Sequence, residues 1–151
     1  MSDDGRNRTS VSFVNQQTVA VDEQKLIDVA LRTARSHGAV GEISLVLTDK
    51  ASIAELNSKH LNGDGPTDVL AFPIDGLVSH PSGGPVLIGE VVLCPEVAVD
   101  QAPEDPRAEM ELLVAHGVLH LLGHDHDDPA RTRLMRDAEE KVVGRAGARF
   151  E

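Results

Sequence analysis

Three histidines near the C-terminal end of the chain constrain its fold and chemistry more than any other feature. They are His116, His120 and His126. Residues four positions apart lie on the same face of a helix, so the imidazoles of His116 and His120 can point at one ion. Gly123 is suited to end that helix by adopting a left-handed conformation. The chain can then turn back and bring His126 to the same ion.

This spacing predicts a metal site. A single histidine on an apolar helix face is more often a core residue, and a pair can arise by chance, but three at this spacing with a glycine at the turn favour metal binding. Three imidazole nitrogens with a fourth position left for water are typical of catalytic zinc. We therefore predict one divalent ion, zinc, held by His116, His120 and His126. Asp125 is a candidate for orienting one of these histidines or accepting a proton, and His124 for lining the pocket.

The expected chemistry is hydrolysis. Zinc bound by three histidines lowers the pKa of its water to about 7 and polarises a carbonyl or phosphoryl oxygen. The spacing is also that of the metzincin peptidases, which carry a glutamate after the first histidine as general base. Here that position is Gly117. Since general-base help is typically worth about 10²–10⁴-fold, the glycine argues against a peptidase, while a small-molecule hydrolase remains an alternative.

Composition sets the domain organisation and the compartment. A chain of 151 residues is expected to form one domain. Its first ten residues are polar and charged and are expected to be disordered, which leaves residues 11–151 as a single zinc-hydrolase-like domain. The single cysteine, Cys94, excludes an internal disulfide and fits a reducing compartment. With no signal peptide and no long apolar span, we expect a cytoplasmic protein without a membrane partner.

Net charge is an argument against strong nonspecific binding to a polyanion. The formal charge is -11, whereas nonspecific affinity for nucleic acid comes largely from Lys and Arg. Residues 130–149 are an exception, with six basic and three acidic side chains. Taken alone, such a segment is more often a solvated helix face.

Hydrophobic periodicity predicts an α+β fold, with a small mixed four-stranded sheet, packed helices and the metal-binding helix at the centre. Strands are expected at 11–14, 43–47, 67–73 and 86–93, and helices between Asp22 and Gly38, at 52–60, at 107–122 and after Asp128. Cys94 follows an apolar run and is expected to be a buried structural thiol. Glu90 interrupts that run, so it lies either on an exposed edge or near the site.

The histidine segment resembles the signature of the YbeY family. Residues 116–126 read HGVLHLLGHDH, against a family pattern of H-G-x-L-H-L-x-G-[YH]-D-H. Two further segments match in the family's order, GPTDVLAFP at 65–73 and LIGEVVLC at 87–94, and the resemblance covers about residues 11–143. By position, His116, His120 and His126 correspond to the family's metal ligands.

The resemblance implies a zinc-dependent, single-strand-specific endoribonuclease that acts in small-subunit (16S) rRNA maturation and ribosome quality control. Its expected partners are rRNA and the ribosomal particle, not DNA. An alternative is a metal-containing ribosome-assembly binding factor with little intrinsic catalysis.

Three positions depart from the family's pattern. Leu61 stands where many members carry an arginine for RNA phosphates, Glu90 where an aspartate is usual, and His124 where tyrosine is commoner. The sequence predicts no oligomeric state, cleavage site or proton donor.

Overall fold

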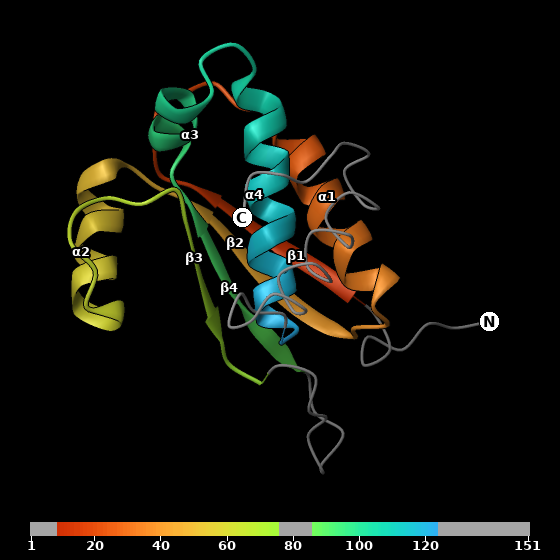
Figure 1. Cartoon of the computed structure of the whole chain (residues 1–151). Helices are drawn as coiled ribbons and strands as arrows, with labels where there is room; N and C mark the ends of the chain where they lie inside the picture. Colours follow the sequence, from red (N-terminus) through yellow and green to blue (C-terminus); the bar gives the residue numbers. More distant parts are fainter. Residues whose placement is uncertain (1–8, 76–85, 124–151) are drawn as a thin grey trace, which may run out of the picture.

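Four strands form a mixed sheet in the order β1-β2-β4-β3 (Figure 1). The computed structural model describes residues 9–75 and 86–123. The elements are β1 (Thr9–Asn15), α1 (Glu23–Ser36), β2 (Gly41–Leu47), α2 (Lys50–Leu61), β3 (Val69–Pro73), β4 (Leu87–Leu93), α3 (Pro95–Gln101) and α4 (Pro106–Leu121). Strands β1, β2 and β4 are parallel, and β3 runs antiparallel to β4. The predicted α+β fold with a mixed four-stranded sheet is confirmed.

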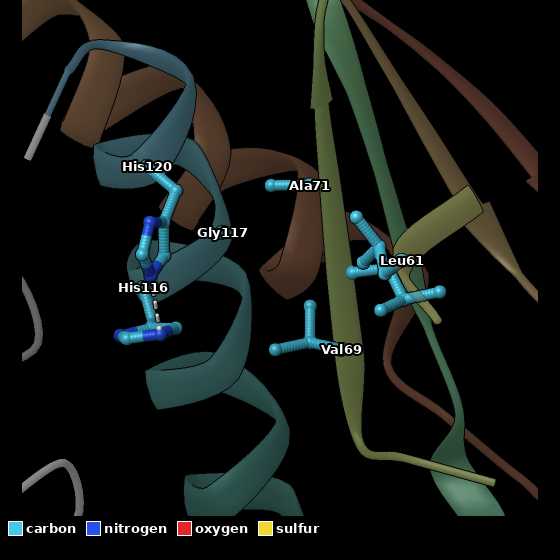
Figure 2. A pocket seen from close by; sticks show the side chains of 7 residues that line it. Leu61, Val69, Ala71, His116, Gly117 and His120 are labelled. Carbon is cyan, nitrogen blue, oxygen red and sulfur yellow. Dashed lines mark hydrogen bonds between the residues drawn. The ribbon is translucent and has the colours of Figure 1, made fainter. Parts of the chain in front are cut away.

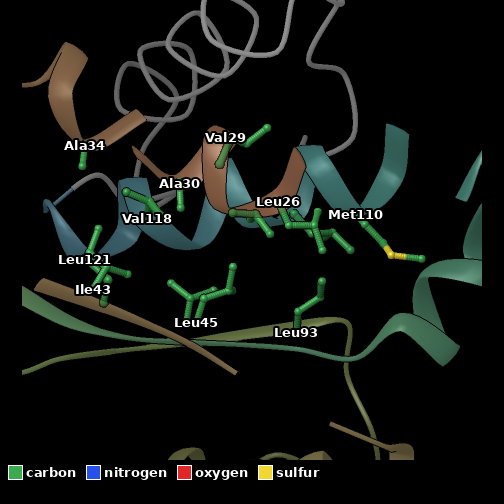
Figure 3. Packing of buried hydrophobic residues seen from close by; sticks show 14 of the residues in the cluster. Leu26, Val29, Ala30, Ala34, Ile43, Leu45, Leu93, Met110, Val118 and Leu121 are labelled. Atoms are coloured by element: carbon green, nitrogen blue, oxygen red, sulfur yellow. The ribbon is translucent and has the colours of Figure 1, made fainter. Parts of the chain in front are cut away.

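The two faces of the sheet pack against different helices. Helices α1 and α4 cover one face, where Leu26, Leu45, Leu93 and Val118 belong to the larger hydrophobic cluster (Figure 3). Helix α2 packs on the opposite face, where Ile53 joins a smaller cluster with residues of β3 and β4. Because α4 lies over β3 and β4, its last turns come close to the edge of the sheet.

Helix α4 is buried almost along its whole length. The carboxylate of Asp105 caps its first turn by accepting a hydrogen bond from the Ala108 amide at 3.2 Å, and Pro106 follows at a position where proline is preferred. The apolar residues of α4 lie on all sides of the helix, which is typical of a helix enclosed by protein. This burial agrees with the central position expected for the helix, whereas metal binding by α4 stays a prediction.

Several predicted boundaries change. Strand β1 begins at Thr9, inside the segment expected to be disordered, because the Thr9 hydroxyl donates to the Ala39 carbonyl at 2.6 Å and the strand pairs with β2 from this residue on. Strand β3 begins at Val69, not at residue 67. Helix α3 was not predicted. Residues 1–8, the loop at 76–85 and the helix expected after residue 128 lie outside the described residues.

The described helices include none that is long and apolar enough to cross a membrane.

Candidate functional site

The side chains of His116 and His120 meet at the C-terminal end of α4. Their Nε2 atoms lie 3.0 Å apart within hydrogen-bond distance, and the ring planes cross at 79° (Figure 2). His116 is buried, with 8% of its surface exposed, and His120 is half-buried. The predicted pairing of two imidazoles on one helix face is confirmed.

This pair fits two ligands of one metal ion. Two nitrogens bound to a tetrahedral zinc at about 2.0–2.1 Å would lie roughly 3.3 Å apart, close to the observed separation. A hydrogen bond between the two Nε2 atoms needs a proton on one and a lone pair on the other, so at least one ring is neutral and can donate to a metal. The geometry and the donor chemistry therefore suit a divalent ion.

His126, His124 and Asp125 lie outside the described residues. Within 9–75 and 86–123, no three His, Cys, Asp or Glu side chains gather as a set of metal ligands. A complete three-histidine site thus stays a prediction.

The end of the helix has the predicted form. The backbone amide of Gly123 donates to the His120 carbonyl at 3.1 Å, and Gly123 has a φ of 97°. L-residues with a β-carbon resist this left-handed conformation. Helix α4 therefore ends directly after the turn that carries His120, as predicted from Gly123.

A cavity of about 230 Å³ adjoins the histidines. Its described lining consists of Leu61, Val69, Leu70, Ala71, His116, Gly117 and His120. Figure 2 shows Val69 and Ala71 on the side of β3 that faces α4, with Leu61 on the opposite side of the strand. Because β3 is the outermost strand, the cavity is lined from both faces of this edge of the sheet.

Position 117 has no room for the glutamate of a metzincin peptidase. A β-carbon added to Gly117 would lie 2.7 Å from Cγ1 and 3.2 Å from Cγ2 of Val91. Real β-carbon contacts essentially never fall below 3.0 Å, so a larger side chain would displace the helix or Val91. The close contact between α4 and β4 supports the sequence argument against a peptidase of that type.

Glu90 lies away from the histidines. Its neighbour Val91 belongs to the cluster beneath α4, and alternate residues of a strand face opposite sides. Glu90 is half-buried on the α2 side, where the Ser44 hydroxyl donates to its Oε2 at 3.4 Å. Neither alternative for Glu90 is borne out: it is not among the described residues that line the cavity, and β4 is not an edge strand because it lies between β2 and β3.

A carboxylate–amide–carboxylate link joins the elements around the cavity. With its amide nitrogen turned toward both acids, Gln101 donates to Asp68 Oδ2 and to Glu109 Oε2, each at 3.2 Å. Asp68 directly precedes β3, and its Oδ1 accepts the Val69 amide at 2.7 Å. Glu109 is 2% exposed on α4. This link was not predicted, although Glu109, an acidic residue among the apolar residues of α4, was a signal for it.

Cys94 is a free, buried thiol, as predicted. Burial raises the pKa of the Cys94 thiol above its ordinary value, which disfavours the nucleophilic thiolate.

Comparison with known proteins places most of the chain in one family. Residues 5–147 match the sequence model of the family described as Endoribonuclease YbeY. The Endoribonuclease YbeY of Salinispora tropica is 42% identical over 147 residues, covering 89% of this chain and 94% of that protein. The Endoribonuclease YbeY of Rhodococcus opacus is 41% identical over 145 residues, covering 89% and 80%.

A solved structure supports the fold. The solution structure of TM1509 from Thermotoga maritima superposes with a TM-score of 0.58 at 24% identity, covering 88% of this chain and 86% of that one. At this level of identity, the likeness concerns the fold alone.

Proposed function

The chain belongs to the Endoribonuclease YbeY family, and on this premise we propose that it is a zinc-dependent endoribonuclease specific for single-stranded RNA. We further propose that it acts in the cytoplasm in 16S rRNA maturation and ribosome quality control. The endoribonuclease role is supported by the family and by the names of its relatives. Zinc dependence is supported by the histidine pair at the end of α4, and substrate binding beside that pair by the adjoining cavity.

The observation that carries the proposal is the convergence of His116 and His120 at 3.0 Å beside the cavity. These two residues, with His126 as the third ligand, would hold one zinc ion. When bound, zinc supplies a Lewis acid for a phosphoryl oxygen and water activated at neutral pH. The burial of His116 and the end of the helix at Gly123 hold the two imidazoles in place before substrate binds.

Metal analysis and RNA cleavage together test this proposal. We expect about one zinc per chain in the purified protein and cleavage of single-stranded RNA, with both lost in His116→Ala. His37→Ala is the matched control, since His37 lies at the end of α1 and outside the cavity lining. Cleavage by a protein with no bound metal, or by His116→Ala at the wild-type rate, would exclude the proposal.

The ribosomal particle is the proposed partner. The net charge is -11, and the described cavity lining contains no Lys or Arg, so the chain itself offers little attraction for phosphates there. We expect purified protein to cleave RNA weakly and to cleave faster when the particle is present. Equal activity with and without the particle would contradict this part.

Two observations keep an assembly factor as the second candidate. The acidic net charge and the absence of Lys and Arg from the described part of the cavity lining favour binding through a protein partner over strong intrinsic nuclease activity. In that case the metal is mainly structural. His120→Ala separates the two functions: loss of rRNA processing with the fold retained favours catalysis, whereas loss of the fold favours a structural ion.

The products of cleavage would identify the nucleophile. Attack by the RNA 2′-hydroxyl leaves a cyclic phosphate, and attack by water leaves a linear one. Mass spectrometry of the fragment ends distinguishes these routes.

A further inference from the structure

The cavity beside the histidines has an apolar wall at the edge of the sheet. Leu61, Val69, Leu70 and Ala71 form this wall, and none of the described lining residues is Lys or Arg. Phosphates are held by cations and by polar hydrogen-bond donors, whereas the planar faces of bases rest on apolar or aromatic surfaces. This part of the cavity is therefore suited to a base and poorly suited to a phosphate.

Leu61 is the exposed member of the wall. It is the last residue of α2, and 51% of its surface is exposed. The turn that follows is fixed, because the Asn57 carbonyl accepts the Gly63 amide at 3.0 Å and the Asn57 side-chain amide donates to the Gly65 carbonyl at 3.1 Å. Leu61 is thus presented to solvent from an anchored position.

The neighbouring aromatic contact also fixes this end of α2. The ring of His60 lies 5.6 Å from the ring of Phe72 on β3, edge to face at 74°. Leu61 therefore has a defined position relative to the edge strand, across that strand from the imidazoles (Figure 2). A ligand that contacts both Leu61 and the imidazoles must therefore pass over the edge of β3.

We propose that Leu61 binds the base of a nucleotide next to the phosphodiester that lies at His116 and His120. This inference rests on the proposed function, namely that the substrate is single-stranded RNA. The cavity of about 230 Å³ is smaller than the roughly 300–1,000 Å³ that accommodate drug-sized ligands, so it suits one base. Leu61 is then a residue that determines specificity through the base and contributes nothing to phosphate binding.

Binding of a fluorescent single-stranded RNA oligonucleotide, measured by anisotropy in the presence of a chelator, tests the proposal without cleavage. We expect Leu61→Ala to weaken binding by roughly fivefold, because apolar contact area is lost. The salt dependence of binding should not change. Leu61→Arg should instead steepen the slope of log K against log salt by about 0.7, the value for one added phosphate contact on a single strand.

RNAs with one abasic nucleotide at successive positions identify the base. At one position the missing base should weaken binding to the wild type and have no further effect on Leu61→Ala. Val14→Ala is the matched control, since Val14 is 44% exposed on β1 at the other edge of the sheet. Circular dichroism checks that each variant is folded.

The outcomes separate this proposal from the proposed function. The base-binding proposal is wrong if the wild type binds and cleaves RNA while Leu61→Ala binds equally well, or if every abasic position affects both proteins alike. The proposed nuclease function would be unaffected by either result. If the wild type neither binds nor cleaves single-stranded RNA, both are wrong.

Discussion

Gly117 lies so close to Val91 that a β-carbon at position 117 would lie 2.7 Å from Val91 Cγ1. The contact brings the helix that carries the histidines directly onto β4. Glycine is otherwise an unfavourable residue inside a helix, by roughly 1 kcal/mol relative to alanine. Its presence in α4 is explained by this close approach.

We therefore expect Gly117→Ala to lower the free energy of unfolding by about 1–3 kcal/mol, the usual cost of overpacking, despite the better helix propensity of alanine. Urea denaturation measures the change. The same substitution in a Val91→Ala background is the control, because this background removes both clashing methyl groups. A cost that is equal in the two backgrounds would show that the contact is not the cause.

The link through Gln101 should stabilise the junction of β3, α3 and α4. Gln101→Leu removes a donor from the carboxylates of Asp68 and Glu109, and the loss of a donor to a buried polar group costs about 1–3 kcal/mol. Gln24→Leu on the exposed side of α1 is the control and should change stability by less than about 0.5 kcal/mol. Equal effects of the two substitutions on urea denaturation would argue against the link.

Stability should fall at alkaline pH because of Cys94. Burial raises the pKa of this thiol in the folded protein, while in the unfolded chain it stays near about 8.5. Above the unfolded pKa the unfolded state releases a proton that the folded state keeps, so the free energy of unfolding decreases as pH rises from there toward the folded pKa. The contribution of Cys94 to the free energy of unfolding is fully present below about pH 8.

The test compares the wild type with Cys94→Ala between about pH 7 and pH 10. The chain has no tyrosine, and Lys50, whose pKa is raised by its hydrogen bond and charge interaction with Asp100, titrates at higher pH. The alkaline decrease in stability should therefore be smaller in Cys94→Ala. Identical pH profiles would contradict the assignment, as would rapid alkylation of Cys94 in the folded protein.

The parts of the fold that follow from local sequence could be predicted. Asp22 caps α1 by accepting the Lys25 amide, and Gly123 ends α4 with a positive φ, because both effects depend on a few neighbouring residues. The pairing of His116 with His120 is likewise fixed by the periodicity of one helix. Helix α3 was missed because it has only seven residues, with too few apolar positions to show a period.

The walls of the site could not be predicted, because they depend on packing between distant segments. Leu61 borders the cavity only because α2 ends beside the edge strand β3. Gln101 contacts Asp68 and Glu109 only because the end of α3 lies between the start of β3 and helix α4. Likewise, the direction of Glu90 depends on the register of β4, which pairs it with Ser44 and Phe72.

Zinc should stabilise the folded protein if His120 is a ligand. At a free zinc concentration about 100-fold above Kd, binding adds about 2.7 kcal/mol, which corresponds to a rise in Tm of roughly 5–10 °C for a chain of this size. Differential scanning fluorimetry with added zinc measures the shift. His120→Ala should abolish it and His37→Ala should keep it. A zinc-induced rise in His120→Ala equal to that of the wild type would show that this residue does not bind the metal.

The turn at Gly123 should matter for metal binding beyond its effect on stability. Gly123→Ala places a β-carbon at a φ of 97° and should lower the free energy of unfolding by about 1–2 kcal/mol. Because His126 is the proposed third ligand and follows Gly123 by three residues, the zinc-induced rise in Tm should also decrease. Gly38→Ala is a matched control: Gly38 follows α1 with a φ of 69°, and an added β-carbon at either glycine meets no atom of the described residues within 4 Å. The control should lose similar stability and keep the full zinc response. If both variants keep that response, the turn does not position a ligand, and the third histidine must reach the ion by another path or not at all.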